Sequence, residues 1–323
     1  MKIRKIIPLL AATALLTGCN LFKSSESFKP SKYSKEATCA EINEKYQNGL
    51  TEVGIPTTSD PVDFSLKGAM QYVVKGSIKK NGQTRESTSI KQVVNFSGEY
   101  DKDSKVAHTN LSAEMTYKAS VGYGSMKYDM KGSDKNESYA QEVVKGDAFE
   151  LTIAHLSEGR YSKETVATES LYAAFFNKVM SSSGFTMGSL IDAASYAAMS
   201  QEMKDQYKFY VDDNQFTMIR SAASESATET KEQKSTTTNT IQYKVKENQL
   251  TYLIDMTQVS EAKYLQDSGD YLAGEIVSQE VQMSYKGTFS FAEVNVKMKD
   301  LSKLSLSSEA FTVNSMFSID LGL

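Results

Sequence analysis

The chain has 323 residues, of which 40% are hydrophobic and 24% are charged, and only four are prolines. This composition is that of a globular protein with one large domain or two ordinary ones, and it excludes a long disordered chain or stalk. The formal net charge of −4 comes from interleaved acidic and basic residues, which excludes the electrostatic footprint of a nucleic-acid-binding protein.

The first residues are typical of an export signal. A basic start is followed by an apolar run from Ile6 to Leu16, which has the length of a secretory signal's apolar region and is too short to span a bilayer. The closing residues, Leu16-Thr17-Gly18-Cys19, resemble the lipobox of bacterial lipoproteins. That resemblance implies a signal peptide over residues 1–18 and a lipid on the sulfur of Cys19. The alternative is an uncleaved apolar helix.

Lipidation would place the protein in the cell envelope. It would be anchored to the outer face of the cytoplasmic membrane, or to the outer membrane in a diderm host, and the membrane would be its partner through the lipid. Residues 19–36 are rich in Ser and Lys and are predicted to form a solvated tether. We expect residues 37–323 to form a single folded domain.

A helix is predicted where this domain begins. Thr38 and Glu41 have the spacing of a capping box, and Gly49 is suited to end the helix in a left-handed conformation. Cys39 recurs at helical spacing with apolar residues and has no cysteine partner if Cys19 carries lipid. We interpret Cys39 as a small buried hydrophobe in preference to a reactive thiol.

Long runs of alternating apolar and polar residues then predict antiparallel strands with one apolar face. The first run spans Leu66 to Ile78, which is longer than an ordinary strand. The Asn81-Gly82 pair that follows suits a type I′ hairpin turn, and a polar turn from Asp101 to Lys105 ends the returning strand. Further strands are predicted at 111–121, 126–130, 149–153, 209–211, 216–218, 241–245, 250–256 and 281–291.

The middle of the chain changes pattern. Val166 to Met180 and Ser189 to Met199 are rich in Ala, Leu, Phe and Met and are predicted to form two helices, separated by a Ser-Gly stretch from Ser181 to Gly188. The polar segment from Ser224 to Thr240 is predicted to be a solvated loop or an exposed strand end, in preference to a binding segment. Alternation from Phe311 to Leu321 predicts a last strand.

These elements define an α+β fold: a large curved antiparallel sheet, or incomplete barrel, covered on its concave face by a few helices, because the apolar face of such strands must be covered. An early helix, long strands, a helical insertion and more strands resemble the LolA-like group of lipoprotein carriers and the LppX and LprG lipid-binding lipoproteins. The resemblance covers roughly Thr38 to Leu323 and rests on element order and the lipoprotein address. It implies an apolar cavity between sheet and helices.

The strand faces are rich in Met and Tyr, which are adaptable residues suited to irregular acyl chains. We predict a lipid-binding pocket there, and the alternative is a plain core filled by the same residues. The candidate lining residues are Met70, Tyr72, Met115, Tyr117, Phe175, Ala194, Ala197, Tyr252, Met283 and Tyr285.

Motifs of catalysis do not appear in the required context, so we expect no enzymatic activity and no cofactor. Two isolated histidines, His108 and His155, provide too few ligands for a zinc or copper site, and Asp212-Asp213-Asn214 is predicted to be a turn because it lacks EF-hand spacing. Two functions remain: a carrier of a lipid or another hydrophobic molecule, or a surface lipoprotein that binds a protein, peptide or glycan.

Overall fold

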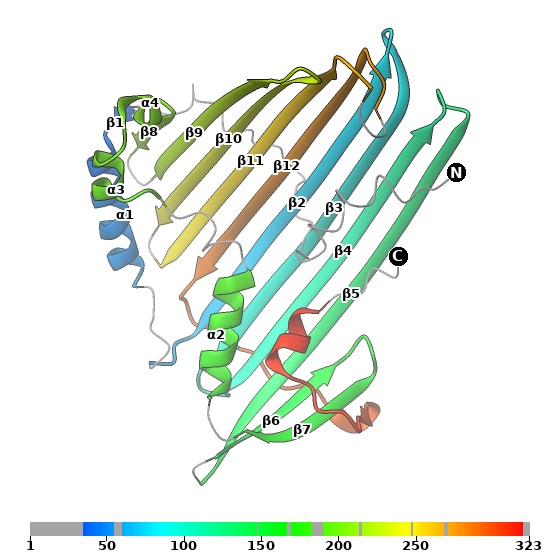
Figure 1. The fold of residues 1–323 in the computed structure, drawn as a ribbon. Helices are drawn as coiled ribbons and strands as arrows, with labels where there is room; N and C mark the ends of the chain where they lie inside the picture. Colours follow the sequence, from blue (N-terminus) through cyan, green and yellow to red (C-terminus); the bar gives the residue numbers. More distant parts are fainter. Residues whose placement is uncertain are drawn as a thin grey trace.

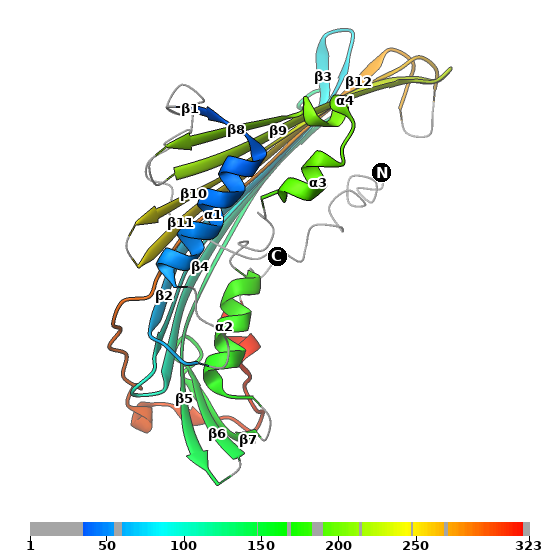
Figure 2. The same cartoon turned by 90° about the vertical axis from the view of Figure 1, so that its left-hand side faces the viewer.

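A single curved sheet of thirteen strands dominates the computed structural model of the protein. The helices lie on the concave face of this sheet, as Figures 1 and 2 show from two sides. The predicted curved antiparallel sheet with a few helices on its concave face is therefore confirmed. The structure describes residues 35–54, 60–146, 148–166, 169–182, 190–212, 215–246, 248–267 and 271–318.

The strand order is β1-β8-β9-β10-β11-β12-β2-β3-β4-β5-β6-β7-β13. Two meanders, β2 to β7 and β8 to β12, meet where β12 pairs with β2, and all pairs are antiparallel except the short contact of β13 with β7. The bounds are β1 Lys35–Ala37, β2 Phe64–Lys80, β3 Gln83–Asp101, β4 Val106–Val121, β5 Met126–Lys145, β6 Ala148–His155, β7 Arg160–Val166, β8 Tyr207–Asp212, β9 Gln215–Ala227, β10 Lys231–Lys246, β11 Gln249–Tyr264, β12 Glu275–Ser290 and β13 Ser305–Leu306.

Two predicted turns are present, and the predicted polar segment forms the ends of two strands. Asn81 and Gly82 both have positive φ angles, 51° and 78°, as a type I′ hairpin requires, and the turn after Asp101 is present. The segment from Ser224 to Thr240 forms the exposed ends of β9 and β10, which pair with each other. The strand-end alternative is therefore the correct one for most of this segment.

Helix α1 (Cys39–Val53) begins as predicted. The Thr38 side chain accepts from the backbone N–H of Glu41, and the Glu41 carboxylate accepts from the backbone N–H of Thr38 at 2.7 Å. The helix ends later than predicted, because Gly54 and not Gly49 adopts the left-handed conformation. Gly49 instead lies against Val245, so its missing side chain serves close packing of the helix on the sheet.

The other helices are shorter than predicted. Helix α2 (Leu171–Ser182) starts five residues after Val166, which belongs to β7. Of the predicted helix over Ser189 to Met199, the described residues from 190 onward contain only α3 (Ala193–Ala197), and α4 (Gln201–Lys204) follows. Asp192 and Ser200 accept backbone N–H groups at the starts of α3 and α4, and such caps begin new helices and interrupt a continuous one. No described helix is long and apolar enough to cross a membrane.

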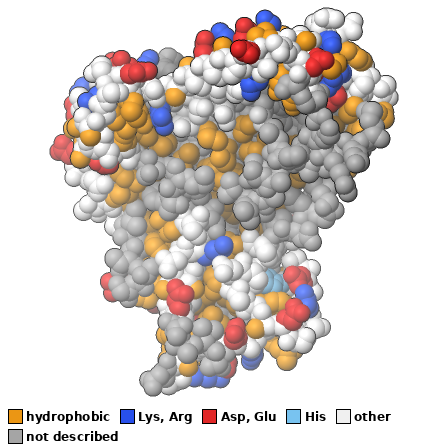
Figure 3. All heavy atoms as spheres, viewed as in Figure 1, with side chains coloured by type: hydrophobic (Ala, Val, Ile, Leu, Met, Phe, Trp, Pro, Cys, Tyr) orange, Lys and Arg blue, Asp and Glu red, His pale blue; other side chains and the backbone are white. Residues whose placement is uncertain are grey.

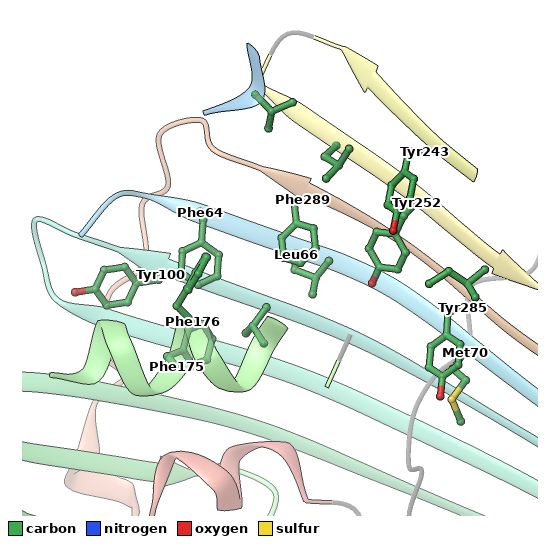
Figure 4. Packing of buried hydrophobic residues seen from close by; sticks show 14 of the residues in the cluster. Phe64, Leu66, Met70, Tyr100, Phe175, Phe176, Tyr243, Tyr252, Tyr285 and Phe289 are labelled. Atoms are coloured by element: carbon green, nitrogen blue, oxygen red, sulfur yellow. The ribbon is translucent and has the colours of Figure 1, made fainter. Parts of the chain in front are cut away.

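The main core fills the space between the concave face of the sheet and helices α1 and α2. Figure 4 shows Phe64 and Tyr100 on the strands beside Phe175 and Phe176 of α2, with Leu66 and Phe289 further along the sheet. Phe64 stands edge-on to Phe176 at a centroid distance of 5.4 Å, a favourable geometry for aromatic rings. This cluster holds the helices on the sheet.

The predicted last strand is wrong within the described residues. Val313–Phe317 form a 3-10 helix, η6, preceded by a shorter one, η5 (Leu301–Lys303). A residue spacing of three places both Val313 and Met316 in the core. The Thr109 hydroxyl of the sheet also donates to the carbonyl of Met316 at 3.0 Å. The apolar pattern at Phe311, Val313 and Phe317 therefore arises from docking on the sheet and not from strand pairing.

Two glycines set how closely aromatic side chains lie on the sheet. Gly68 and Gly287 are partners across β2 and β12, and a Cβ atom on either would overlap the ring of Phe96 or of Tyr252, respectively. These two rings flank the glycine pair in the same cross-strand row. Each ring therefore packs directly on the backbone of one glycine.

We predict that Gly287→Ala lowers the free energy of unfolding by about 1–3 kcal/mol, because the Tyr252 ring must move within a packed core. The matched control is Gly76→Ala on β2, where the nearest atom to the added Cβ is 3.8 Å away. Chemical denaturation of the three proteins checks this. Equal stability of both variants would contradict the close-packing role.

Candidate functional site

The concave face carries apolar side chains beyond the region that the helices contact. Helix α1 contacts β8 to β11, and α2 contacts β4, β5 and η6 and packs its aromatic side chains on Phe64 of β2 and Tyr100 of β3. Further along the strands, beyond the cross-strand row through Met70, β12, β2, β3, β4 and β5 still place apolar residues on this face. We call this set the apolar stripe; it consists of Val277, Val281, Met283, Tyr72, Val74, Ile78, Ile90, Met115, Tyr117, Ala119, Met126, Tyr128 and Met130.

Most residues of the stripe are only partly buried. Tyr72, Val74 and Tyr117 are half-buried, and Met126 and Met130 on β5 are 45% and 49% exposed. In the space-filling view of this face, hydrophobic side chains are visible over the sheet and among the helices, while charged side chains gather along the rim (Figure 3). The stripe is thus an apolar surface.

The stripe has a sharp boundary on the sheet. The convex residues of the same strands are mainly Lys, Ser, Thr and Glu, for example Lys75, Lys91 and Lys118. On the concave face it ends at β12. Beside it, β11 still has Met256 opposite Met283, but the equivalent positions of β10 are polar, for example Thr237 and Asn239. An extended sheet wetted on both faces does not need one apolar face.

The predicted pocket residues fall into three groups. Met70, Phe175, Tyr252 and Tyr285 are buried in the main core. Tyr72, Met283, Met115 and Tyr117 belong to the apolar stripe, where Tyr72 and Met283 pack at the margin of the core.

Ala194 and Ala197 lie elsewhere. Both are exposed on α3, which packs through Tyr196 against Phe209 of β8 at a centroid distance of 5.2 Å. The structure therefore does not bring these alanines to the stripe. Cys19 and most of the Ser181–Gly188 stretch lie outside the described residues.

Cys39 is buried, as predicted, with 4% of its surface exposed. Burial raises the pKa of its thiol, which disfavours the reactive thiolate. The amide nitrogen of Asn43 donates to the carbonyls of Cys39 and Ile191, both at 2.8 Å. This part of α1 therefore anchors the segment that leads to α3.

A cavity of about 430 Å³ lies on the opposite, convex face. Its floor is formed by β3, β4 and β5, and its rim by the segment 295–299. Burial disfavours a charged Asp101, but backbone N–H groups of Ser104 and Val296 donate to it and lower its pKa. The carboxylate thereby holds the rim segment on the sheet. The lining residues are Glu99, His108, Tyr139, Asn295, Val296, Lys297 and Lys299.

His108 occupies the centre of this convex cavity. Its Nδ1 lies 3.3 Å from Glu99 Oε2 and its Nε2 lies 3.6 Å from Glu137 Oε1, while its ring stacks on Tyr139 at 4.3 Å. Burial and the hydrogen bond to Glu137 raise the pKa of Tyr139 to about 12. The ammonium nitrogen of Lys299 lies over the Tyr139 ring, 5.2 Å from the ring centroid. The mixture of charges suits a small polar or zwitterionic ligand.

Sequence reasoning missed the convex cavity because its parts come from three strands and a distant segment. One signal was available, since the turn after Asp101 places Glu99 opposite His108 in the hairpin register. Nothing in the local pattern indicates that residues 295–299 cross this face.

His155 forms a second polar cluster, which is buried. Its Nδ1 lies 2.6 Å from Ser138 Oγ and its Nε2 lies 2.9 Å from Ser315 Oγ, and Ser138 Oγ donates to Asn136 at 2.7 Å. Ser138 is fully buried and His155 is 2% exposed. This serine–histidine contact therefore joins β5 and β6 to η6 and is closed to a substrate.

Comparisons with known proteins identify no relative by sequence. No family model matches the chain, and no curated protein matches it. Among solved structures, the outer membrane protease OmpT of Escherichia coli matches at 6% identity over 73% of this chain and 100% of its own, with a TM-score of 0.22. A FadL homologue of Pseudomonas aeruginosa matches at 7% identity over 71% and 90%, with a TM-score of 0.14. TM-scores this low do not indicate a shared fold.

We predict that acidification weakens the fold through His155. Burial lowers the pKa of His155 in the folded state, so its contribution to stability is complete above the unfolded-state value of about 6.5 and is lost as pH falls below that value. The difference in unfolding free energy between wild type and His155→Gln should therefore shrink from pH 8 to pH 5. Urea denaturation across this range measures it, and a difference independent of pH would contradict the prediction.

Proposed function

We propose that this protein is a lipid-anchored envelope lipoprotein that binds an acyl chain or another hydrophobic ligand on the apolar stripe. The observation that carries the proposal is that the stripe continues along β2, β4 and β12 beyond the helices, while the convex face of the same strands is polar. Contiguous apolar surface of this kind is characteristic of an interaction site.

Element lengths support the proposal. Strand β5 has 20 residues and extends about 65 Å at ~3.3 Å per residue. Helix α1 has 15 residues and extends about 22 Å at ~1.5 Å per residue. Neither α1 nor α2 is long enough to cover such strands. An extended ligand would fit the apolar surface that remains.

The energetics are sufficient without a charged contact. Burial of one methylene group contributes about 0.8 kcal/mol, so ten methylenes contribute roughly 8 kcal/mol before the costs of ordering the ligand. Met115, Tyr117 and Met283 are also adaptable or amphipathic side chains, which suits chains of irregular shape.

We predict that a charge in the stripe weakens lipid binding. Tyr117→Lys should lower the affinity for a fluorescent fatty-acid probe by at least roughly tenfold, because a charged group is costly to bury beside an acyl chain. Thr116→Lys on the same strand is the matched control, since Thr116 is also half-buried but lies on the convex face.

Mass spectrometry of organic extracts from the purified full chain identifies the ligand. If the unaltered protein carries no extractable lipid and binds no acyl probe, the carrier function is wrong. The convex cavity around His108 then favours the second candidate, a surface lipoprotein that binds a polar protein, peptide or glycan group.

We predict that Cys19→Ser blocks anchoring, because the lipid would be joined to this sulfur. The variant should remain unprocessed or leave the membrane fraction. Labelling cells with a radioactive or clickable fatty acid, followed by fractionation, checks the prediction. Cys39→Ser is the control and should be lipidated normally. Unchanged processing and membrane retention of the Cys19 variant would contradict the lipoprotein assignment.

A further inference from the structure

Among the described residues, the first half of strand β5 has a neighbouring strand, β4, on one side only. β6 pairs with β5 only from Ser138 to Lys145, and among the described residues no strand lies beside Met126 to Ser133 on the side away from β4. Every residue from Met126 to Lys131 is exposed, including the large apolar side chains of Met126, Tyr128 and Met130. Free strand edges with apolar side chains invite pairing with another chain.

The register of neighbouring hydrogen bonds shows which backbone groups face outward. The carbonyl of Glu137 accepts from Leu156 on the β6 side at 2.9 Å, whereas the N–H of Glu142 donates to Lys105 on the β4 side at 3.1 Å. Alternate residues of an antiparallel strand present their N–H and C=O groups to the same neighbour. Lys127, Asp129 and Lys131 therefore offer theirs to the free edge.

We propose that this edge pairs with the same edge of a second copy, antiparallel and with Met130 on the two-fold axis. In that register Asp129 stands opposite the partner's Lys131, and Lys131 stands opposite the partner's Asp129. Tyr128 faces the partner's Gly132, which leaves room for the ring. Opposite charges and aromatic side chains paired across strands stabilise a sheet.

The charges along the edge and the length of strand that can pair select this register. Centring the pair on Asp129 would place Lys127 opposite the partner's Lys131, and centring it on Lys131 would place Lys127 opposite the partner's Lys135. Both arrangements put like charges directly opposite each other, which destabilises a sheet. Centring on Tyr128 also avoids these contacts, but it pairs only the five residues from Met126 to Met130, because β5 begins at Met126. Centring on Gly132 would extend the pairing to Glu137, whose carbonyl already accepts from Leu156. Centring on Met130 avoids the like-charge contacts, pairs nine residues of each strand from Met126 to Asp134, and places the two Met130 side chains in contact.

Pairing of this kind joins the two concave faces. Residues directly opposite each other in a sheet share a face, so Met126, Tyr128 and Met130 of one copy continue the apolar stripe of the other. The dimer is an interaction of the strand edge and does not require that the stripe binds lipid. A monomer that binds lipid would therefore overturn this inference alone.

Charge reversal tests the register in the full chain, purified in detergent. Asp129→Lys and Lys131→Asp should each weaken dimerisation at least roughly tenfold, measured by sedimentation velocity, because each places like charges opposite each other twice. The double variant Asp129→Lys, Lys131→Asp should restore the dimer. Asp129 also pairs with Lys118, but both side chains are more than half exposed, so equal thermal midpoints are expected for the four proteins at concentrations where all of them are monomeric.

Disulfide trapping tests the contact itself. Met130→Cys should form an intermolecular disulfide under mild oxidation, since opposite residues at a non-hydrogen-bonded position lie about 4.5 Å apart between Cα atoms. Leu306→Cys is the control, because Leu306 is 65% exposed and belongs to β13, far from the paired residues along the sheet order. A monomer at all concentrations, larger polymers without trapping at Met130, or equal trapping at Leu306 would overturn the proposal.

Discussion

The structure depends on how much of the apolar face of the sheet the helices can cover. Strands such as β3 and β5, with 19 and 20 residues, are far longer than helices α1 and α2, with 15 and 12. A sheet needs its apolar face covered to be stable. The helices meet that need only over part of the strands, where the aromatic cluster around Phe64 and Phe175 forms the main core. The division of the sheet into a core region and the apolar stripe follows from this difference in length.

Buried polar groups complete the core region by fixing the segments that cover it. Glu142 is 6% exposed and accepts from the N–H of Leu171 at 2.6 Å, at the start of α2, where a negative charge also complements the helix dipole. Asp101 holds the rim of the convex cavity, and His155 holds η6. A buried carboxylate or imidazole without its partner is costly, so each group selects one position for the segment it contacts.

Periodicity predicted the sheet well because most of its long strands have apolar residues on one face and polar residues on the other over much of their length. It also located the Asn81-Gly82 turn and the capping box at Thr38, where the local chemistry leaves few alternatives. It failed where tertiary contacts decide the outcome. The apolar residues around Val313 follow the core and not a strand ladder, and α3 is limited by local caps. The convex cavity depends on a distant segment crossing the sheet, which no local pattern encodes.

The candidate site shows the same limits. Periodicity assigned Met70, Tyr72, Met115 and Tyr285 to one face, and the structure places them there, but only contacts across the sheet separate the buried residues of this set from those of the stripe. Lysines such as Lys127 and Lys131 have two effects on the sheet. Along a strand with two neighbours they would only keep one face wet. At an edge without a neighbouring strand they also exclude some registers of pairing, so one alternating pattern constrains both the exposed face of the sheet and the registers in which its edge can pair.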